Sequence, residues 1–412
     1  MRRIGRQSAT GTEGPANPTY FMKTKVIKDS SSGQGTPAEA VKATKAAKGQ
    51  ATSPPVHDAI FLGLDLHSGH IRVVRQTDQS NPQPAQRLNW DADWRPGKAQ
   101  GILGYAQRQL SLAKKVYAVY EAGAFGFRLC RELQALGIEC YVTKPCKLDP
   151  EHRRVQTDKT DARELADRLE RYVRGNTRAM VVVTVPTPEQ EAQRSEARHR
   201  HYLQKELQSV RAHGRGVLLS QGFRYVQCWW QEGCWKELAP KLSEQVRAAL
   251  EDCRKLIELY EQLLPPVEAK LKASAPQELP VGFGALTFVL LRREIYQWER
   301  FGTRRKVACF TGLCGGVSSS GPAHFDLSIT KVGNRRLRTL LVELAWRMVF
   351  YQPEYKPVKK WEPILRSQSK GQRRQRKRAI VAVARQLAVD IWKWQTGKIT
   401  PEQLGWRMPK AK

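Results

Sequence analysis

The fold is decided by the stretch Ile60–Asp65, which reads IFLGLD and is apolar up to its last residue. A short apolar run bounded by turn residues is typical of a buried β-strand. A second run, Val116–Glu121 (VYAVYE), has the same form and also ends in an acid, directly before a turn that contains Gly123. We therefore expect two strands of one sheet, each delivering a carboxylate to the same end.

Around these two runs, strand-like and helix-like segments alternate. The expected elements are strands at Ala59–Leu66, Ile71–Gln76 and Gln86–Trp90, a helix at 99–113, a strand at Val116–Ala122, a helix at 127–136 and a strand at Ile138–Thr143. The first three strands form an antiparallel meander, and the alternation that follows predicts an α/β sheet covered on both faces.

The remaining composition divides the chain into four parts. Residues 1–57 read as a flexible basic arm, 58–186 as the α/β domain, 187–277 as a helical hairpin with coiled-coil character, and 278–412 as a mostly helical C-terminal domain. In the last part the Gly/Ser-rich segment 312–321 reads as an interruption between helices. The expected architecture is thus α/β plus α.

The hairpin is predicted from a heptad-like seam. Its apolar residues recur with 4-3 spacing at Leu242, Val246, Ala249, Cys253, Leu256, Tyr260 and Leu263, with a weaker partner upstream at Leu203, Leu207, Val210 and Val217. Such a seam fits a coiled coil that joins subunits, and it fits equally an amphipathic pair packed within one chain.

Charge indicates the class of partner. The chain of 412 residues carries 70 Lys+Arg against 39 Asp+Glu, a formal net charge of +31. A polyanion is the expected partner, and nucleic acid is favoured over a membrane surface. No apolar stretch reaches the roughly eighteen residues of a membrane span, so we expect a protein of the cytoplasm. The eight cysteines lack CxxC spacing, which disfavours zinc fingers and predicts reduced, mostly buried thiols.

Two further acids stand three residues apart, at Asp158 and Asp161, and would share one face of a helix. Together with Asp65 and Glu121 they would repel one another unless divalent cations lay between them, and all-oxygen ligation suits Mg²⁺ or Mn²⁺. Simpler readings exist, since acids favour a helix N-terminus and the strand acids could pair with arginines.

These acids lie in familiar motifs. Gly63–His67 (GLDLH), Glu121–Gly123 (EAG) and Thr157–Ala162 (TDKTDA) resemble the DEDD domain of the insertion-sequence one-ten transposases, relatives of the Piv DNA invertases. The resemblance implies a RuvC-like or ribonuclease-H-like fold. It also implies that Asp65, Glu121, Asp158 and Asp161 bind the metal.

The C-terminal part resembles the second domain of the same family. The matching segments are Phe310–Leu313 (FTGL), Ser319–Gly321 (SSG), Ile329–Asn334 (ITKVGN) and Leu337-Arg338. There the serine directly before the glycine is the nucleophile, which corresponds to Ser320. Without the resemblance, the residues around Ser320 read as a solvated, flexible turn. The basic arm and Cys314-Gly315-Gly316 depart from the family pattern.

The resemblance implies a DNA recombinase that cuts and rejoins strands through a phosphoserine linkage, with divalent metal. It further implies donor and target DNA, a structured non-coding guide RNA of the bridge type, a homo-oligomer, and a place at the bacterial nucleoid. Two other functions fit part of the sequence. One is a RuvC-like nuclease that uses water, and the other is a non-catalytic RNA-binding scaffold.

Phosphate contacts are expected from two basic groups. The larger one directly precedes an expected apolar helix at Ala379–Trp394 and contains Lys370, Arg373, Arg374, Arg376, Lys377 and Arg378. The smaller one contains Lys331, Arg335 and Arg338. Runs of this kind can also be merely solvated.

Overall fold

The structure, a computed structural model, describes residues 56–78, 80–90, 101–145, 158–224, 226–320, 323–367 and 369–409. The basic arm expected at 1–57 lies outside the described residues apart from its last two. For Asp158, Ser319, Ser320 and Lys370 only the backbone is described.

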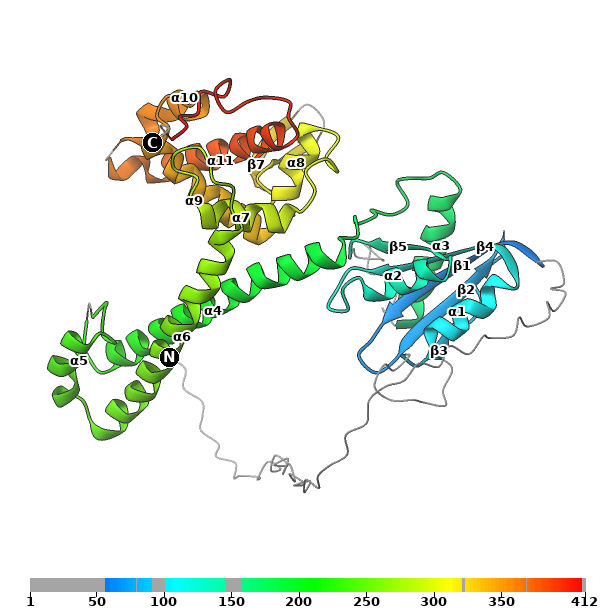
Figure 1. Ribbon diagram of the computed structural model, residues 1–412, viewed down its shortest axis with the longest axis horizontal. Helices are drawn as coiled ribbons and strands as arrows, with labels where there is room; N and C mark the ends of the chain where they lie inside the picture. The colour runs from blue at the N-terminus through cyan, green and yellow to red at the C-terminus, as the bar shows by residue number, and fades with distance from the viewer. Residues whose placement is uncertain are drawn as a thin grey trace, which may run out of the picture. The chain divides into compact units, whose positions relative to one another are not determined.

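A five-stranded mixed sheet forms the N-terminal domain (Figure 1). Its strands are β1 (His57–Leu66), β2 (Ile71–Thr77), β3 (Gln86–Leu88), β4 (Ala113–Glu121) and β5 (Glu139–Thr143). They lie in the order β3-β2-β1-β4-β5. β2 pairs antiparallel with β1 and β3, whereas β4 pairs parallel with β1 and β5. The prediction of a mixed α/β architecture that begins with an antiparallel meander is confirmed.

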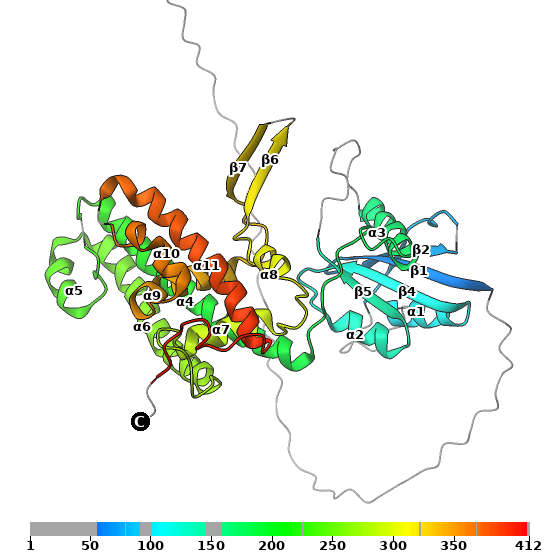
Figure 2. The same cartoon turned by 90° about the horizontal axis from the view of Figure 1, so that it is seen from above.

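Helices cover both faces of this sheet, as Figure 2 shows. α1 (Ile102–Leu110) and α2 (Arg128–Ala135) pack on one face, and α3 (Asp158–Val173) packs on the other. Alternation along β1 decides which residue faces which layer. Leu62 belongs to the cluster formed with α1 and α2, whereas Phe61 packs with Leu165 of α3.

Helix α3 approaches β1 most closely at Gly63. A Cβ atom placed on Gly63 would lie 2.1 Å from the carbonyl oxygen of Ala162 and 2.6 Å from the backbone nitrogen of Ala166. No side chain fits in that space. Glycine at this position is therefore what lets the helix backbone rest directly on the strand.

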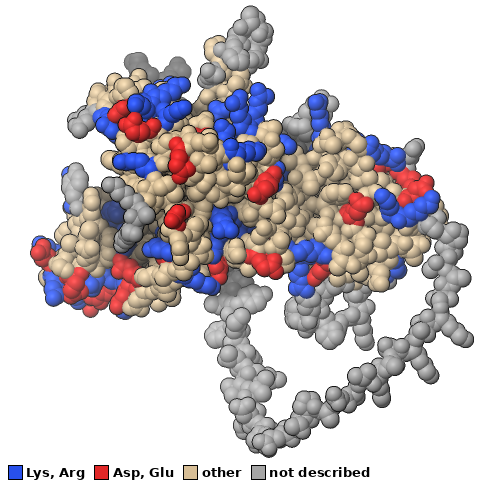
Figure 3. Space-filling model, turned by 45° about the horizontal axis from the view of Figure 1, so that its top comes forward, with Lys and Arg blue, Asp and Glu red and all other residues tan. Residues whose placement is uncertain are grey.

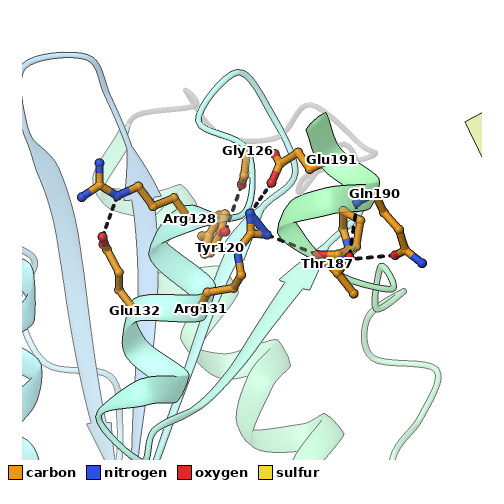
Figure 4. A network of polar contacts seen from close by, with 9 residues as sticks. Tyr120, Gly126, Arg128, Arg131, Glu132, Thr187, Gln190 and Glu191 are labelled. Carbon is orange, nitrogen blue, oxygen red and sulfur yellow. Dashed lines mark hydrogen bonds and ion pairs between the residues drawn. The ribbon is translucent and has the colours of Figure 1, made fainter. Parts of the chain in front are cut away.

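Helix α4 (Pro188–Ser220) starts immediately after the sheet domain. Thr187 caps it, because the Thr187 side chain accepts from the backbone of Gln190 and the Gln190 side chain accepts from the backbone of Thr187. Arg131 of α2 donates to the Pro186 carbonyl and forms an ion pair with Glu191 (Figure 4). The start of α4 is thus tied to the sheet domain by charge and by a helix cap.

The hairpin consists of α4 and α6 (Glu244–Ala273), with α5 (Glu232–Leu238) and a short 3₁₀ turn (Ala239–Lys241) between them. The predicted pairing is present, since Leu203 and Leu207 of α4 are buried. The predicted phase of the α6 seam is partly wrong. The residues turned toward the interior are Val246, Leu250, Cys253, Ile257, Tyr260, Leu264, Val267 and Leu271.

Three of the predicted seam residues face outward instead. Leu256 is 46% exposed and Leu263 is 42% exposed, and Ala249 is exposed as well. Leu259, also exposed at 48%, continues this outer stripe. Helix α6 therefore has two apolar stripes, of which α4 covers one.

The aromatic tip between the helices closes the hairpin. Trp229 is fully buried, and its indole nitrogen donates to the carbonyl of Arg211 at 3.0 Å. Its ring occupies the space beside Gly214, where a Cβ atom would lie 2.0 Å from the ring. The Arg211 guanidinium lies 4.3 Å from the centroid of the Trp230 ring. The tip is a small core of its own, which the sequence pattern did not reveal.

The C-terminal region is a bundle of helices with one β-hairpin. Its elements are α7 (Ala285–Ile295), α8 (Arg304–Thr311), β6 (Gly315–Ser320), β7 (Ala323–Ile329), α9 (Arg335–Tyr351), α10 (Lys356–Leu365), a 3₁₀ turn (Lys370–Gln372) and α11 (Arg373–Gln395). The Gly/Ser segment is thus ordered into strands rather than a flexible loop, which corrects the expectation. Among the described residues, no helix is both long enough and apolar enough to cross a bilayer.

The cysteines also differ from expectation. Of those that the structure describes, Cys130 and Cys140 are buried, whereas Cys228, Cys234 and Cys309 are exposed. All of the described thiols are free.

Candidate functional site

The two acids at the strand ends are neighbours on the sheet. In the parallel register of β1 and β4, Leu64 pairs with Tyr120, so Asp65 and Glu121 are the next residues along each strand. Both lie two residues beyond the pair Gly63 and Val119, and they therefore face the same side of the sheet as α3. On β2, Arg72 stands opposite Asp65 in the register.

Helix α3 runs antiparallel to β1 and begins at this same edge. Near its start, Ala162 meets Gly63. Further along, Leu169 packs in the same cluster as Phe61, and Glu170 binds Gln76, the residue that pairs with Phe61. The first turn of α3, which carries Asp158 and Asp161, is consequently the part nearest to the ends of β1 and β4.

The described acids at this edge are half-buried. The Asp65 side chain is 23% exposed, and its Oδ2 lies 2.9 Å from Nε2 of His67. The His67 ring stacks on that of His70 with centroids 4.7 Å apart. Within the described side chains, no three acids, histidines or cysteines form a cluster that could hold a metal. The side chain of Asp158 falls outside that description.

Sequence reasoning did not single out His67 as a contact of Asp65. The signal was present, because His67 follows Asp65 by two residues just past the strand end. It also missed the structural role of Gly63. A glycine inside an apolar strand is the available cue to a close backbone approach.

The close approach at Gly63 predicts a strong effect of a single methyl group. Gly63→Ala should destabilise the domain by about 3 kcal/mol, because backbone atoms of α3 have no room to yield. The added methyl group should also push α3 off β1 and so move Asp161 away from Asp65. Thermal unfolding measures the first effect. Gly104→Ala in α1 is the matched control, since nothing lies within 4 Å of the added Cβ there. Equal unfolding temperatures for the two variants would contradict the close contact.

Ser320 is the last residue of β6, at the turn end of the β6–β7 hairpin. It pairs with Ala323, and Ser319 pairs with His324. The hairpin extends away from the helices of its own region (Figure 2). Among its described side chains, Val317, Phe325 and Leu327 are exposed by more than half, at 56%, 63% and 55%. The hairpin thus places the backbone of Ser320 at its turn end, on the same strand as the exposed Val317.

The root of this hairpin brings the predicted C-terminal motifs together. The backbone nitrogen of Lys331 donates to Gly312, and that of Asn334 donates to Phe310. Arg338 donates to the carbonyls of Thr311 and Lys331 at 3.1 and 3.2 Å. The Arg338 guanidinium, expected at a phosphate, is therefore engaged in holding the hairpin, whereas Lys331 is exposed.

The larger basic group, apart from Lys370 in the preceding 3₁₀ turn, lies in the first turns of α11 rather than ahead of the helix. Arg373, Arg374, Lys377 and Arg378 are exposed. Arg376 is half-buried and lies 5.8 Å from the centroid of the Trp346 ring. The four exposed side chains are thus available to a polyanion at the positive end of a helix dipole.

Known proteins similar to this chain are transposases of insertion sequences. The family model "Transposase IS116/IS110/IS902 family" matches residues 278–359. A candidate transposase of Sinorhizobium fredii, y4rJ, is 30% identical over 380 residues, which cover 84% of this chain and 93% of the relative. The transposase of insertion sequence element IS1533 of Leptospira borgpetersenii is 24% identical over 71% of this chain and 86% of its own length. The transposase of IS1111A of Coxiella burnetii is 27% identical over 64% of this chain and 72% of its own length.

Proposed function

Because this chain belongs to the IS116/IS110/IS902 family of insertion-sequence transposases, we propose that it cuts and rejoins DNA through a covalent link to Ser320. The acids Asp65, Glu121, Asp158 and Asp161 act in the same reaction. The single observation that carries the acid site is the shared edge, where β1, β4 and the first turn of α3 meet on one face of the sheet. A RuvC-like role for this domain is part of the proposal.

The donor set at the edge suits a hard cation. Carboxylate oxygens dominate it, as Mg²⁺ and Mn²⁺ require, and the converging negative charge needs compensation. Asp65, Glu121, Asp158 and Asp161 would hold the ion, which when bound would offset charge developing on the phosphate. His67 keeps the Asp65 carboxylate in place through the 2.9 Å contact.

Ser320 supplies the nucleophile in this proposal. Its hydroxyl oxygen bonds to phosphorus and gives up its proton, while the bond from phosphorus to a deoxyribose oxygen breaks and that oxygen gains a proton. Attack of the freed end on the phosphoserine reverses the step and rejoins the strand. Its place in a hairpin whose described side chains Val317, Phe325 and Leu327 are exposed supports this role, because a phosphate can approach such a hairpin.

The net positive charge of the chain supports nucleic acids as its partners. Lys and Arg side chains gather in groups on the face drawn in Figure 3, and the excess of 70 basic over 39 acidic residues adds a long-range attraction. We include donor and target DNA, and a guide RNA of the bridge type, as the proposed partners. Because these partners include DNA, we also propose that the protein acts at the bacterial nucleoid.

The direct test of this function is a covalent adduct. Purified protein is incubated with end-labelled element DNA, guide RNA and Mg²⁺, then run on a denaturing gel. We expect label to migrate with the protein and to be lost after protease treatment. Cleaved DNA without any protein-bound label would instead support the water-using nuclease.

The outer stripe of α6 is the proposed subunit contact. Ala249, Leu256, Leu259 and Leu263 form an apolar line that α4 leaves uncovered. A homo-oligomer would cover it with the same stripe of a second copy.

We expect Leu256→Asp with Leu263→Asp to shift the sedimentation profile toward monomer, because both side chains are exposed within one chain. Helical content should stay unchanged. Tyr260→Asp is the contrasting variant, since Tyr260 packs against α4 within the hairpin and its charge should unfold that element. A double variant that sediments like the parent protein would show that the stripe joins no subunits.

A further inference from the structure

A cleft of about 660 Å³ lies between α4 and α9, and none of the four proposed metal-binding acids lines it. Basic side chains line it from both helices. α4 supplies Arg200, His201 and Lys205, and α9 supplies Arg335 and Arg336. Only Arg335 among them was expected from the sequence to contact nucleic acid.

The α9 side of the cleft concentrates positive charge. α9 begins at Arg335 after the N-cap Asn334 and has no acid in its first turn. Two exposed guanidinium groups thus add to the positive end of a helix dipole, which is unfavourable without a nearby anion. Within the described part of the chain, neither Arg335 nor Arg336 forms an ion pair.

The buried acid of the cleft does not neutralise them. Glu294 is only 3% exposed, and its carboxylate accepts from Arg198 at 3.1 and 3.2 Å and from Asn334 at 2.8 Å. Burial acts to raise the pKa of Glu294, but these contacts outweigh it and the pKa is lowered. Glu294 is therefore ionised. Arg198 bonds to it directly and the charge of Arg336 acts on it as well, so this one acid serves two arginines.

On the α4 side, one cation is paired closely and the other only at the limit of an ion pair. Arg200 forms an ion pair with Glu268 of α6 at 2.5 Å. Lys205 is 72% exposed and reaches only the adjacent Glu206, at 3.9 Å. Glu343 is the remaining acid of the lining. The lining thus carries four positive charges against the two negative charges of Glu294 and Glu343, which leaves the cleft positive. The four cations are Arg200, Lys205, Arg335 and Arg336.

The positive charge of the cleft also acts on His201. Burial lowers the pKa of His201, and the nearby positive charges of Arg336 and Arg200 lower it further. The imidazole is therefore neutral at pH 7 and can donate one hydrogen bond and accept another. Gln204 and Gln208 add uncharged hydrogen-bonding groups to the lining. Cations beside neutral donors form a surface that suits phosphate oxygens.

From this arrangement we infer that the α4–α9 cleft binds backbone phosphates of nucleic acid, as a site separate from the acid edge and from the basic turns of α11. The inference rests on the proposed function only for the identity of the polyanion. Each phosphate seated there releases counterions, so the cleft contributes to the salt dependence of binding.

The test compares two triple variants that lose the same charge. Lys205→Gln with Arg335→Gln and Arg336→Gln removes the three lining cations that have no close ion pair among the described residues. Lys236→Gln with Lys241→Gln and Lys255→Gln removes three exposed lysines near the tip of the helical hairpin. Affinity for a DNA duplex and for an RNA hairpin is measured by fluorescence anisotropy over a series of KCl concentrations. The buffer is at pH 7 and contains no divalent metal ion.

We expect the slope of log affinity against log salt to fall in magnitude by about 2 to 3 for the cleft variant, at about 0.9 per phosphate on duplex DNA. A loss confined to one probe identifies DNA or RNA as the occupant. The control variant should keep the parent slope. Gln204→Glu adds a negative charge to the cleft without removing an arginine. It should weaken binding of the same probe.

Two results would overturn the inference and leave only diffuse charge attraction. One is an equal slope for both triple variants, and the other is an unchanged slope for both probes. Thermal unfolding of each variant excludes misfolding as the cause. Because binding is measured without cleavage, the result is independent of Ser320. A protein that forms no covalent adduct yet shows the slope change would refute the proposed chemistry and retain the cleft.

Discussion

Ser320→Ala is expected to abolish the covalent protein–DNA adduct and to reduce strand cleavage on the order of 10³-fold or more. The substitution removes one hydroxyl from the turn end of β6 and changes neither net charge nor the backbone pairing with Ala323. Binding of DNA and RNA should therefore stay at the parent level. Labelled DNA on denaturing gels and anisotropy titrations measure the two properties side by side.

Ser319→Ala is the matched control, because Ser319 is chemically identical and precedes Ser320 on the same strand. We expect it to retain adduct formation at least in part. Strand joining by Ser320→Ala, or an adduct mapped to Ser319 by mass spectrometry, would show that the nucleophile is assigned to the wrong residue. Undiminished cleavage by Ser320→Ala would favour the water-using nuclease.

The second large effect concerns the acid edge. Asp161→Asn keeps the shape of the side chain but removes its charge, and we expect it to abolish cleavage while nucleic-acid binding persists. The same loss should follow excess chelator and be reversed by added Mg²⁺ or Mn²⁺. Asp161 lies in the first turn of α3, where a purely structural acid would contribute only about 0.3 to 1 kcal/mol of stability. Cleavage assays and thermal unfolding on one preparation separate the two roles.

Asp167→Asn is the control on the same helix. Asp167 is 41% exposed and forms an ion pair with Arg171 at 2.5 Å, one turn and a half beyond Asp161. Its loss should cost little stability and no cleavage. Full activity of Asp161→Asn, or of the parent protein in chelator, would count against a metal site at this edge.

The strands of the acid edge could be predicted because local signals agreed there. The run Ile60–Asp65 is apolar up to the acid that ends it, and Val116–Glu121 repeats this form. A long connection that includes β2, β3 and α1 lets β1 and β4 pair in parallel, so their ends fall at one edge. The register in which Leu64 pairs with Tyr120 is what makes Asp65 and Glu121 neighbours.

Other features were decided by contacts that no local pattern records. Helix α6 carries Leu256 and Ile257 side by side, and both continue a 4-3 spacing through Cys253 and Tyr260. Only the packing of α4 buries Ile257 and exposes Leu256. Likewise, the segment Gly315–Ser320 has a composition typical of turns, and its strand depends on pairing with β7. The site of Trp229 was invisible because it is formed by the missing side chain of Gly214.

The contact at Gly63 has a consequence for genetics. The atoms that would collide with a new side chain there are the carbonyl oxygen of Ala162 and the backbone nitrogen of Ala166, which every amino acid carries. Shrinking a side chain on α3 would therefore not make room. In a selection for restored transposition, suppressors of a Gly63 variant would be absent from the facing turn of the helix, and true reversion at codon 63 would be the route back.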